Sequence, residues 1–291
     1  MKQMKPEVGA WVSIGSYFVL SSVKLSVGYW TNSQALKADG LNNFTDIISS
    51  IAILIGLLIA KKPRDENHPY GHSRAEHISS LLAAFIMMTI GMEVLMDAAL
   101  ALKSDKKMVP DAIAAWTAFF AACFMFFVYL FNKKLAERTN SQAIAAAAKD
   151  HLSDALVSIG TVIGIMGTHI GVIWLDSLTA LIVGLIICKT AWDIFKEASY
   201  TLTDGFDEEK LRQYKQEISE IPGVEQVTDV KARMLGNEVI LDVTIQVSPY
   251  LNVVKSHEIA DCIEVFMQEK HDVTKTHVHI EPYSTLDEKT H

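Results

Sequence analysis

Two pairs of polar side chains stand inside stretches that are otherwise apolar enough to lie in a membrane. Asn42 and Asp46 occupy one stretch, and Asp150 and Asp154 occupy another. Each pair is spaced i, i+4, so both of its side chains lie on one face of a helix, about one turn apart. Ionisable groups at membrane depth are costly and usually face a bundle interior or an aqueous cavity. Together the two faces would offer four oxygen-bearing side chains to one cation.

Three carboxylates at one such site need a counter-charge, because like charges at close range repel one another. Bound metal or bound protons can supply it. If metal entry displaces protons and metal exit lets them rebind, the site exchanges the two ions. The pattern therefore predicts proton-coupled antiport, with plain helix–helix hydrogen bonding as the alternative role for the four residues.

Other polar residues in the apolar stretches fit structural roles better. Glu93 and Asp97 form a further acidic pair, and Lys24 lies in the first apolar stretch. For these three we expect mutual pairing or snorkelling to the membrane interface. His151 points about 100° around the helix from its neighbour Asp150, which indicates packing or support of the site.

The elements that must position these residues are membrane helices. The chain has 291 residues, of which 50% are hydrophobic, and its mean hydropathy is +0.22. Six runs are long enough to cross about 30 Å of hydrocarbon. They lie near residues 9–30, 35–60, 78–102, 112–132, 143–168 and 172–196. We therefore expect an all-α six-helix membrane bundle over residues 1–203.

The distribution of basic residues predicts the orientation of this bundle. Loops rich in Lys and Arg follow the second and fourth runs, which places both termini in the cytoplasm by the positive-inside rule. Three lysines after the third run, Lys103, Lys106 and Lys107, count against this orientation. We expect a multi-pass protein of the cell membrane.

Residues 204–291 differ from the preceding segment in composition and in hydrophobic pattern. They hold 18 acidic and nine basic residues, a net charge of −9, against −8 for the whole chain. Helical spacing over 207–220, alternating runs over 224–234 and 238–247, a helical stretch over 254–270 and a last strand over 272–281 follow in order. This predicts a small cytosolic α+β domain of α-β-β-α-β order, ferredoxin-like or metallochaperone-like, with its helices on one face of the sheet.

Several functions are disfavoured by the sequence. No basic face is available to meet nucleic acid, and no phosphate-cradling G-x-x-x-x-G-K-[ST] stretch is present for ATP. No nucleophile motif supports an enzyme. The three cysteines have no spacing typical of disulfides or thiolate metal sites. No cofactor is expected.

The stretch from Ser33 to Asp46, SQALKADGLNNFTD, and the DHLSD sequence from Asp150 to Asp154 resemble the second- and fifth-span signatures of the cation diffusion facilitators. The resemblance covers nearly the whole chain. It implies a homodimeric divalent-metal transporter with cytosolic termini. Carried over position by position, it implies a transport site made of Asn42, Asp46, Asp150 and Asp154.

Departures from the zinc-type members of that family bear on the ion. Zinc-type relatives usually place His in the set, most often where Asp150 stands, and commonly Asp or His where Asn42 stands. An all-oxygen site suits Mn²⁺ better than Zn²⁺, so this chain is similar to the manganese-type branch. Fe²⁺ is the nearest rival, and Zn²⁺ is favoured by affinity alone.

The resemblance also implies accessory features. The segment from Asp65 to Glu76 matches the family's D-x-x-H-x-x-x-H loop, and its metal-binding and structural roles are equally open. A cytosolic metal site is implied less strongly, because no His stands near Thr228 and Asp229, where the family has one. An ion pair between span three and the cytosolic domain is implied as well. The residues are Asp65, His68 and His72 for the loop site, His257, His279 and Glu281, with His277 nearby, for the cytosolic site, and Arg74 with Asp204 for the ion pair.

The sequence thus predicts an efflux transporter that exports Mn²⁺ by proton-coupled antiport with alternating access. The alternatives are an Fe²⁺ or Zn²⁺ exporter of the same family and a membrane-anchored metal-sensing protein. An anchor has no use for acidic pairs at membrane depth, which favours the transporter.

Overall fold

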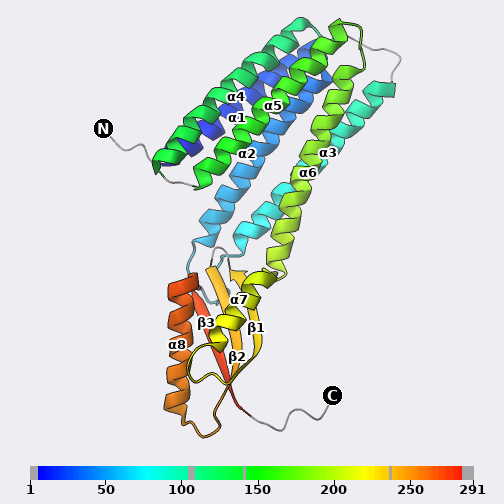
Figure 1. Cartoon of the computed structure of the whole chain (residues 1–291). Helices are drawn as coiled ribbons and strands as arrows, with labels where there is room; N and C mark the ends of the chain where they lie inside the picture. Colours follow the sequence, from blue (N-terminus) through cyan, green and yellow to red (C-terminus); the bar gives the residue numbers. More distant parts are fainter. Residues whose placement is uncertain (1–5, 104–108, 140–141, 236–237, 284–291) are drawn as a thin grey trace. The chain divides into compact units, whose positions relative to one another are not determined.

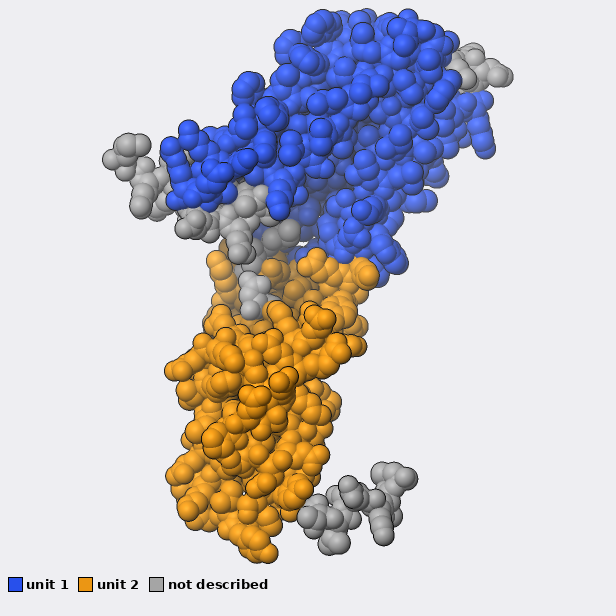
Figure 2. All heavy atoms as spheres, in the orientation of Figure 1, with its two compact units in different colours: residues 1–54, 79–195 blue, residues 55–78, 196–291 orange. Residues whose placement is uncertain are grey.

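The structure is a computed structural model that describes residues 6–103, 109–139, 142–235 and 238–283. The chain divides into two compact units (Figure 2). One comprises residues 1–54 and 79–195, and the other comprises residues 55–78 and 196–291. Each unit is described by itself.

Six long helices precede the C-terminal domain (Figure 1). They are α1 (Pro6–Thr31), α2 (Gln34–Ala60), α3 (Ala75–Lys103), α4 (Ala112–Thr139), α5 (Gln142–His169) and α6 (Leu175–Leu202). The six-helix prediction is confirmed. Most of the helices run some residues beyond the predicted apolar stretches, whereas α6 begins at Leu175, three residues after its predicted start.

Five of these helices, α2 to α6, are long and apolar enough to cross a membrane by length and composition, within the described residues. Helix α1 is similar in length but is not in that group. Its apolar side chains are interrupted by the polar residues Ser13, Ser16, Ser21, Ser22 and Lys24. Four of these five are buried, so the polar side of α1 faces the bundle.

Small residues bring the helices close together. A side chain at Gly40 on α2 would meet Leu25 of α1 at 3.0 Å, and one at Gly91 on α3 would meet Cys188 of α6 at 2.6 Å. Small residues at such contacts are typical of membrane helix packing. Helices α1, α2, α4 and α5 also share a buried cluster around Tyr17 and Met125. Helices α2 and α5 are therefore held side by side.

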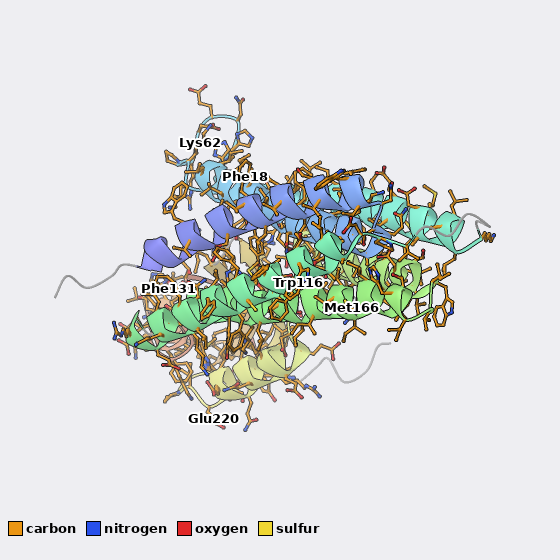
Figure 3. All side chains as sticks on the ribbon, turned by 90° about the horizontal axis from the view of Figure 1, so that it is seen from above. Phe18, Lys62, Trp116, Phe131, Met166 and Glu220 are labelled. Atoms are coloured by element: carbon orange, nitrogen blue, oxygen red, sulfur yellow. The ribbon has the colours of Figure 1, made fainter. Side chains whose placement is uncertain are left out.

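Large apolar side chains cover much of the outer surface of the bundle. Phe18 on α1 is 65% exposed and Trp116 on α4 is 61% exposed, and both are labelled in Figure 3. Extensive apolar exposure of this kind marks an interaction surface in an aqueous protein. On helices that can span a bilayer, it fits contact with lipid.

The C-terminal domain has the predicted α-β-β-α-β order. Its elements are α7 (Glu208–Ser219), β1 (Gln226–Leu235), β2 (Glu238–Val247), α8 (Val253–His271) and β3 (Lys275–Pro282). The sheet has the order β1-β2-β3, with β1 antiparallel and β3 parallel to β2. This matches a ferredoxin-like β-α-β-β-α-β motif that lacks its first strand.

Both helices of this domain pack on the sheet. Tyr214 and Ile218 of α7 join Ile263 and Met267 of α8 in one core with the buried residues of β2, among them Leu241. Along β2, buried positions alternate with half-buried ones, as the pleat of a strand requires. The domain therefore has a hydrophobic core of its own.

Side-chain caps define where these two helices begin. The Asp207 carboxylate accepts backbone N–H bonds from Glu209 and Lys210 at 2.8 and 3.1 Å, and the Asn252 side chain accepts one from Lys255 at 2.9 Å. Asp and Asn are among the preferred residues at this position because their oxygens satisfy free N–H groups.

Candidate metal-binding site

The two predicted polar pairs meet between α2 and α5. The Asn42 side-chain nitrogen donates a hydrogen bond to an Asp154 carboxylate oxygen at 3.0 Å. Both residues are buried, 8% and 7% exposed. Since helix–helix contacts cannot be read from i, i+4 spacing, this contact is new information from the structure.

Asp46 and Asp150 are the other two residues of the set that the sequence predicts as a transport site. We call this predicted set the transport site: Asn42, Asp46, Asp150 and Asp154. Asp46 is half-buried, and its Oδ2 atom is buried without a hydrogen-bond partner. It lies within electrostatic range of Asp150 and Asp154. Asp150 is exposed in the single chain. The three carboxylates therefore lie within electrostatic range of one another. Asp154 is at the buried end of the set and Asp150 is at its accessible end.

The three carboxylates are not drawn into a tight cluster. Among the described residues, the one group of acidic, His or Cys side chains whose ligand atoms all lie within 4.8 Å of one another is elsewhere, in the loop before α3. Like charges at close range repel one another, and a cation bound between carboxylates would neutralise that repulsion.

A buried polar layer lies beside the transport site and includes His151. The ring of His151 is fully buried, 5.1 Å from that of Tyr17 by centroid. Its Nε2 contacts the Ser13 hydroxyl at 2.8 Å, and Asn132 donates to the same hydroxyl at 3.0 Å. These contacts give His151 a packing role, in agreement with its predicted orientation.

Lys24 does not behave as expected. It neither pairs with Glu93 or Asp97 nor reaches the interface, since it is 1% exposed and forms an ion pair with Asp39 at 2.8 Å. Glu93 and Asp97 are exposed. The expectation was wrong because it matched charges by type, whereas the packing of α1 on α2 selects the partner that is close in space.

The loop between α2 and α3 does form a cluster. Asp65 contacts His68 Nδ1 at 3.0 Å and His72 Nε2 at 3.5 Å, and the rings of His68 and His72 are 4.2 Å apart by centroid. Hydrogen bonding from His68 is the main cause that lowers the pKa of Asp65. One carboxylate and two imidazoles in this arrangement are a donor set that Zn²⁺ and other transition metals accept.

The predicted cytosolic site is not assembled in the described part of the chain. His279 lies 3.7 Å from Glu281, but His257 contacts Asp261 at 3.6 Å instead, and no group containing all three predicted ligands is found there. His277 contacts Asp242 at 3.2 Å. His257 lies on α8, whereas His279 and Glu281 lie on β3. Local spacing in the sequence does not predict the distance between these two elements.

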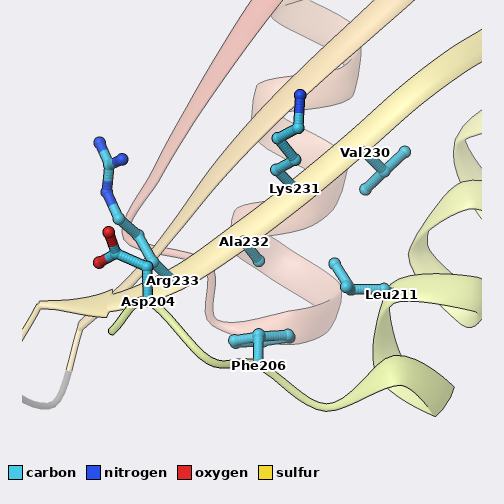
Figure 4. Close-up of a pocket in the computed structure, with 7 residues that line it drawn as sticks. All are labelled: Asp204, Phe206, Leu211, Val230, Lys231, Ala232 and Arg233. Carbon is cyan, nitrogen blue, oxygen red and sulfur yellow. The ribbon is translucent and has the colours of Figure 1, made fainter. Parts of the chain in front are cut away.

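Arg74 and Asp204 do meet. The guanidinium of Arg74 donates to an Asp204 carboxylate oxygen at 2.8 Å, and both side chains are 47% exposed. Asp204 also lines a pocket of about 340 Å³ with Phe206, Leu211 and four residues of β1 (Figure 4). The pocket residues Lys231 and Arg233 have carboxylate partners of their own, Asp229 and Asp242.

Taken together, these features define a class of protein. Five helices among the described residues are long and apolar enough to span a membrane, an oxygen-rich set with a buried contact lies between two of them, and a separate α+β domain follows. This arrangement is typical of a multi-pass membrane protein that binds cations between its helices.

Comparison with known proteins identifies the family. Residues 10–203 match the cation efflux transmembrane domain, and residues 206–283 match the cytoplasmic domain of cation efflux proteins. The chain belongs to the cation efflux family, the cation diffusion facilitators, whose members are metal transporters and not enzymes.

Relatives with stated roles are similar over nearly their full length. The manganese efflux system protein MneS of Bacillus subtilis (strain 168) is 55% identical over 278 residues, which are 96% of each chain. The manganese efflux system protein MneP of the same organism is 28% identical over 94% of this chain and 95% of its own. A solved structure, the copper form of the MamM C-terminal domain, is 26% identical with a TM-score of 0.26, covering 28% of this chain and 79% of that one.

Proposed function

We propose that this cation efflux protein exports Mn²⁺ across the cell membrane in exchange for protons. The observation that carries the proposal is the contact of Asn42 with Asp154 between α2 and α5, which makes one set of four oxygen-bearing side chains. The two relatives named as manganese efflux proteins support the choice of ion.

Ligand chemistry favours Mn²⁺ as cargo. Carboxylate and amide oxygens suit Mn²⁺, whereas imidazole and thiolate suit Zn²⁺. The transport site contains neither His nor Cys. Fe²⁺ accepts similar ligands, and Zn²⁺ binds most N and O sites more tightly than either ion, so selection against Zn²⁺ must come from geometry.

Protons are the counter-ion in this proposal. Asp46 keeps a buried oxygen without a partner, and repulsion between neighbouring carboxylates is relieved by either a proton or a metal ion. Metal binding then releases protons, and metal release takes them up. Alternating access of the bundle to its two sides would couple these steps to transport.

The proposal includes the arrangement of the chain. Residues 1–203 form the transmembrane domain, residues 204–291 form a cytosolic domain, and both termini face the cytoplasm. The family-model matches over 10–203 and 206–283 support this boundary. The protein acts as a homodimer in the lipid bilayer, with neither ATP nor nucleic acid as a partner.

Two accessory metal sites belong to the same proposal with unequal support. Asp65, His68 and His72 have their ligand atoms within 4.8 Å of one another and would hold one ion in the loop. A cytosolic site at His257, His279 and Glu281 stays a prediction.

Ion uptake into proteoliposomes tests the function. Mn²⁺, Fe²⁺ and Zn²⁺ are offered separately under an imposed pH gradient, with Asp154→Ala as the blank. We expect Mn²⁺ uptake that needs both the gradient and Asp154. Uptake of Zn²⁺ that is faster than that of Mn²⁺ would contradict the choice of ion. Uptake that is independent of the pH gradient would contradict proton antiport.

The second candidate is a membrane-anchored metal sensor, which the histidine cluster of the loop favours. A sensor would bind metal in this loop and move no ion into the liposomes. Uptake of any of the three ions that is lost in Asp154→Ala would exclude it.

A further inference from the structure

A second buried polar cluster lies between α1, α2 and α5. The Lys24 ammonium donates to Asp39 Oδ1 at 2.8 Å, to Asn43 Oδ1 at 2.7 Å and to Ser158 Oγ at 2.9 Å. All four residues are at most 1% exposed. The ammonium therefore uses all three of its donors inside a shell of three oxygens.

This cluster adjoins the transport site on both helices. On α2, Asp39 comes three residues before Asn42 and Asn43 comes directly after it. On α5, Ser158 lies one turn beyond Asp154. Lys24 is within electrostatic range of Asp46 and Asp154. A fixed positive charge thus lies roughly one helical turn from the proposed ligands.

The cluster has the composition of a cation site. Asp39 Oδ2 is buried and has no hydrogen-bond partner, and neither has Asn43 Nδ2. The Asp39 carboxylate, the Asn43 amide oxygen and the Ser158 hydroxyl surround a single cation, which is the ammonium of Lys24. Without Lys24, Asp39 would be a further uncompensated carboxylate beside the transport site.

We propose that Lys24 is a tethered cation that occupies Asp39 and thereby weakens metal binding at the transport site enough for the ion to leave. An exporter needs binding that is firm enough to admit its ion and weak enough to release it. The ammonium repels a divalent cation directly and also neutralises the carboxylate that would otherwise help to hold it. The inference rests on the proposed function, and Lys24 acts as a positioning residue because it reaches the metal only through charge.

Opposite effects of two single variants follow from this proposal. Lys24→Met should lower the KM for Mn²⁺ and also lower the maximal rate, because binding tightens and release slows. Asp39→Asn should raise the KM, because the ammonium is then uncompensated. Even in a water-like dielectric, which gives the smallest effect, a divalent and a monovalent charge roughly 8 Å apart change the affinity about fivefold, so each shift should be at least about fivefold.

The double variant Lys24→Met/Asp39→Asn separates charge from structure. It removes both buried charges with side chains of similar size, a change that proteins often tolerate. If the pair acts through charge, the double variant should return the KM to within about twofold of the wild-type value. If Lys24 merely links α1 to α2 and α5, the double variant should be as impaired as the single variants, which would overturn the proposal.

The full-length protein in detergent provides a second readout. Bound Mn²⁺ is followed by loss of the electron paramagnetic resonance signal of free aqueous Mn²⁺, which measures the Kd without transport. The same order is expected, with Lys24→Met tightest and Asp39→Asn weakest. Equal Kd values for all four proteins, or a Kd raised in Lys24→Met, would contradict the proposal.

Failure of the proposed function would look different, since the wild-type protein itself would then move no Mn²⁺. In that event Kd values are measured with Zn²⁺ by calorimetry, because the charge argument applies to any divalent ion. Opposite shifts in the two single variants would still support the role of Lys24, and unshifted values would refute it.

Discussion

Asp150 differs from the other members of the transport site because it is exposed in the single chain, whereas Asn42 and Asp154 are buried. An exposed ligand position tolerates a change of side chain with little effect on packing. The family resemblance also implies that zinc-type members most often have His at the position of Asp150. Substitution there should therefore change which ion is bound without unfolding the bundle.

We expect Asp150→His to shift preference from Mn²⁺ toward Zn²⁺, because imidazole is a better ligand for Zn²⁺ than for Mn²⁺. The ratio of initial uptake rates, Zn²⁺ over Mn²⁺, should rise about tenfold. Asp150→Asn is the matched control, since it removes the same charge without adding an imidazole. An unchanged ratio in Asp150→His, or an equal rise in Asp150→Asn, would refute the role given to this position.

Individual residues were predictable from sequence as far as local spacing reaches. The i, i+4 rule put Asn42 with Asp46 and Asp150 with Asp154, but the pairing of the two faces came from the family resemblance, and the contact itself from the structure. The partners of Lys24 were not predictable. Asp39, Asn43 and Ser158 are 15, 19 and 134 residues away from it, and helix packing alone decides which of several acidic residues it meets.

At the scale of elements, α7 and α8 are joined by a charged contact beside the domain core. Glu217 on α7 contacts His271 Nε2 at 2.5 Å and the Lys270 ammonium at 3.1 Å, both on α8. Hydrogen bonding from His271 is the main cause that lowers the pKa of Glu217 from 4.5 to about 2. The ionised carboxylate therefore stabilises the folded domain.

The pH dependence follows from this depressed pKa. A carboxyl group whose pKa is lower in the folded state than in the unfolded state stabilises the fold at pH values above the unfolded-state pKa, here near 4.5. This stabilisation is lost as the pH falls through the folded-state pKa of about 2. Glu217→Gln should reduce hydrogen-exchange protection of α7 and α8 about fivefold at pH 7, equivalent to about 1 kcal/mol.

The comparison uses the full-length protein and takes wild type against variant at each pH, so that intrinsic exchange rates cancel. The difference should shrink between pH 4.5 and 2. Glu264→Gln, an exposed position on α8, is the control and should change protection little. A difference that stays constant down to pH 2 would show that the ionisation of Glu217 is not what joins the helices.

Elements were predicted well where periodicity was long, and less well at their ends. The last strand begins at Lys275 and not at residue 272, because Asp272 adopts a left-handed conformation (φ 54°) that closes α8. Asp is not the usual residue there, since Gly or Asn is expected. Helix α1 was predicted from its apolar length, and the structure shows that Ser13, Ser16, Ser21 and Lys24 form a buried polar face on it. Local propensity alone showed neither feature.

At the scale of the whole molecule, the Arg74–Asp204 pair connects the segment before α3 with the segment after α6. Both side chains are 47% exposed, and ion pairs at such exposure contribute only about 0.2–1 kcal/mol. The pair therefore adds little to overall stability. The upper part of that range, about 0.4–1 kcal/mol, is nevertheless enough to bias two conformations of a transporter about two- to fivefold.

We expect Asp204→Ala to lower the maximal rate of Mn²⁺ uptake about two- to fivefold, with unchanged membrane insertion and an unchanged KM, because the transport site is not touched. Lys62→Ala, an exposed change in the same unit, should leave uptake at the wild-type level. The charge exchange Arg74→Asp/Asp204→Arg should recover most of the lost rate, since it restores attraction with the signs reversed. Full activity in Asp204→Ala would show that the pair has no role in transport. A lower rate in Asp204→Ala that the charge exchange does not restore would assign Asp204 a role other than pairing, such as holding the left-handed turn (φ 59°) that follows α6.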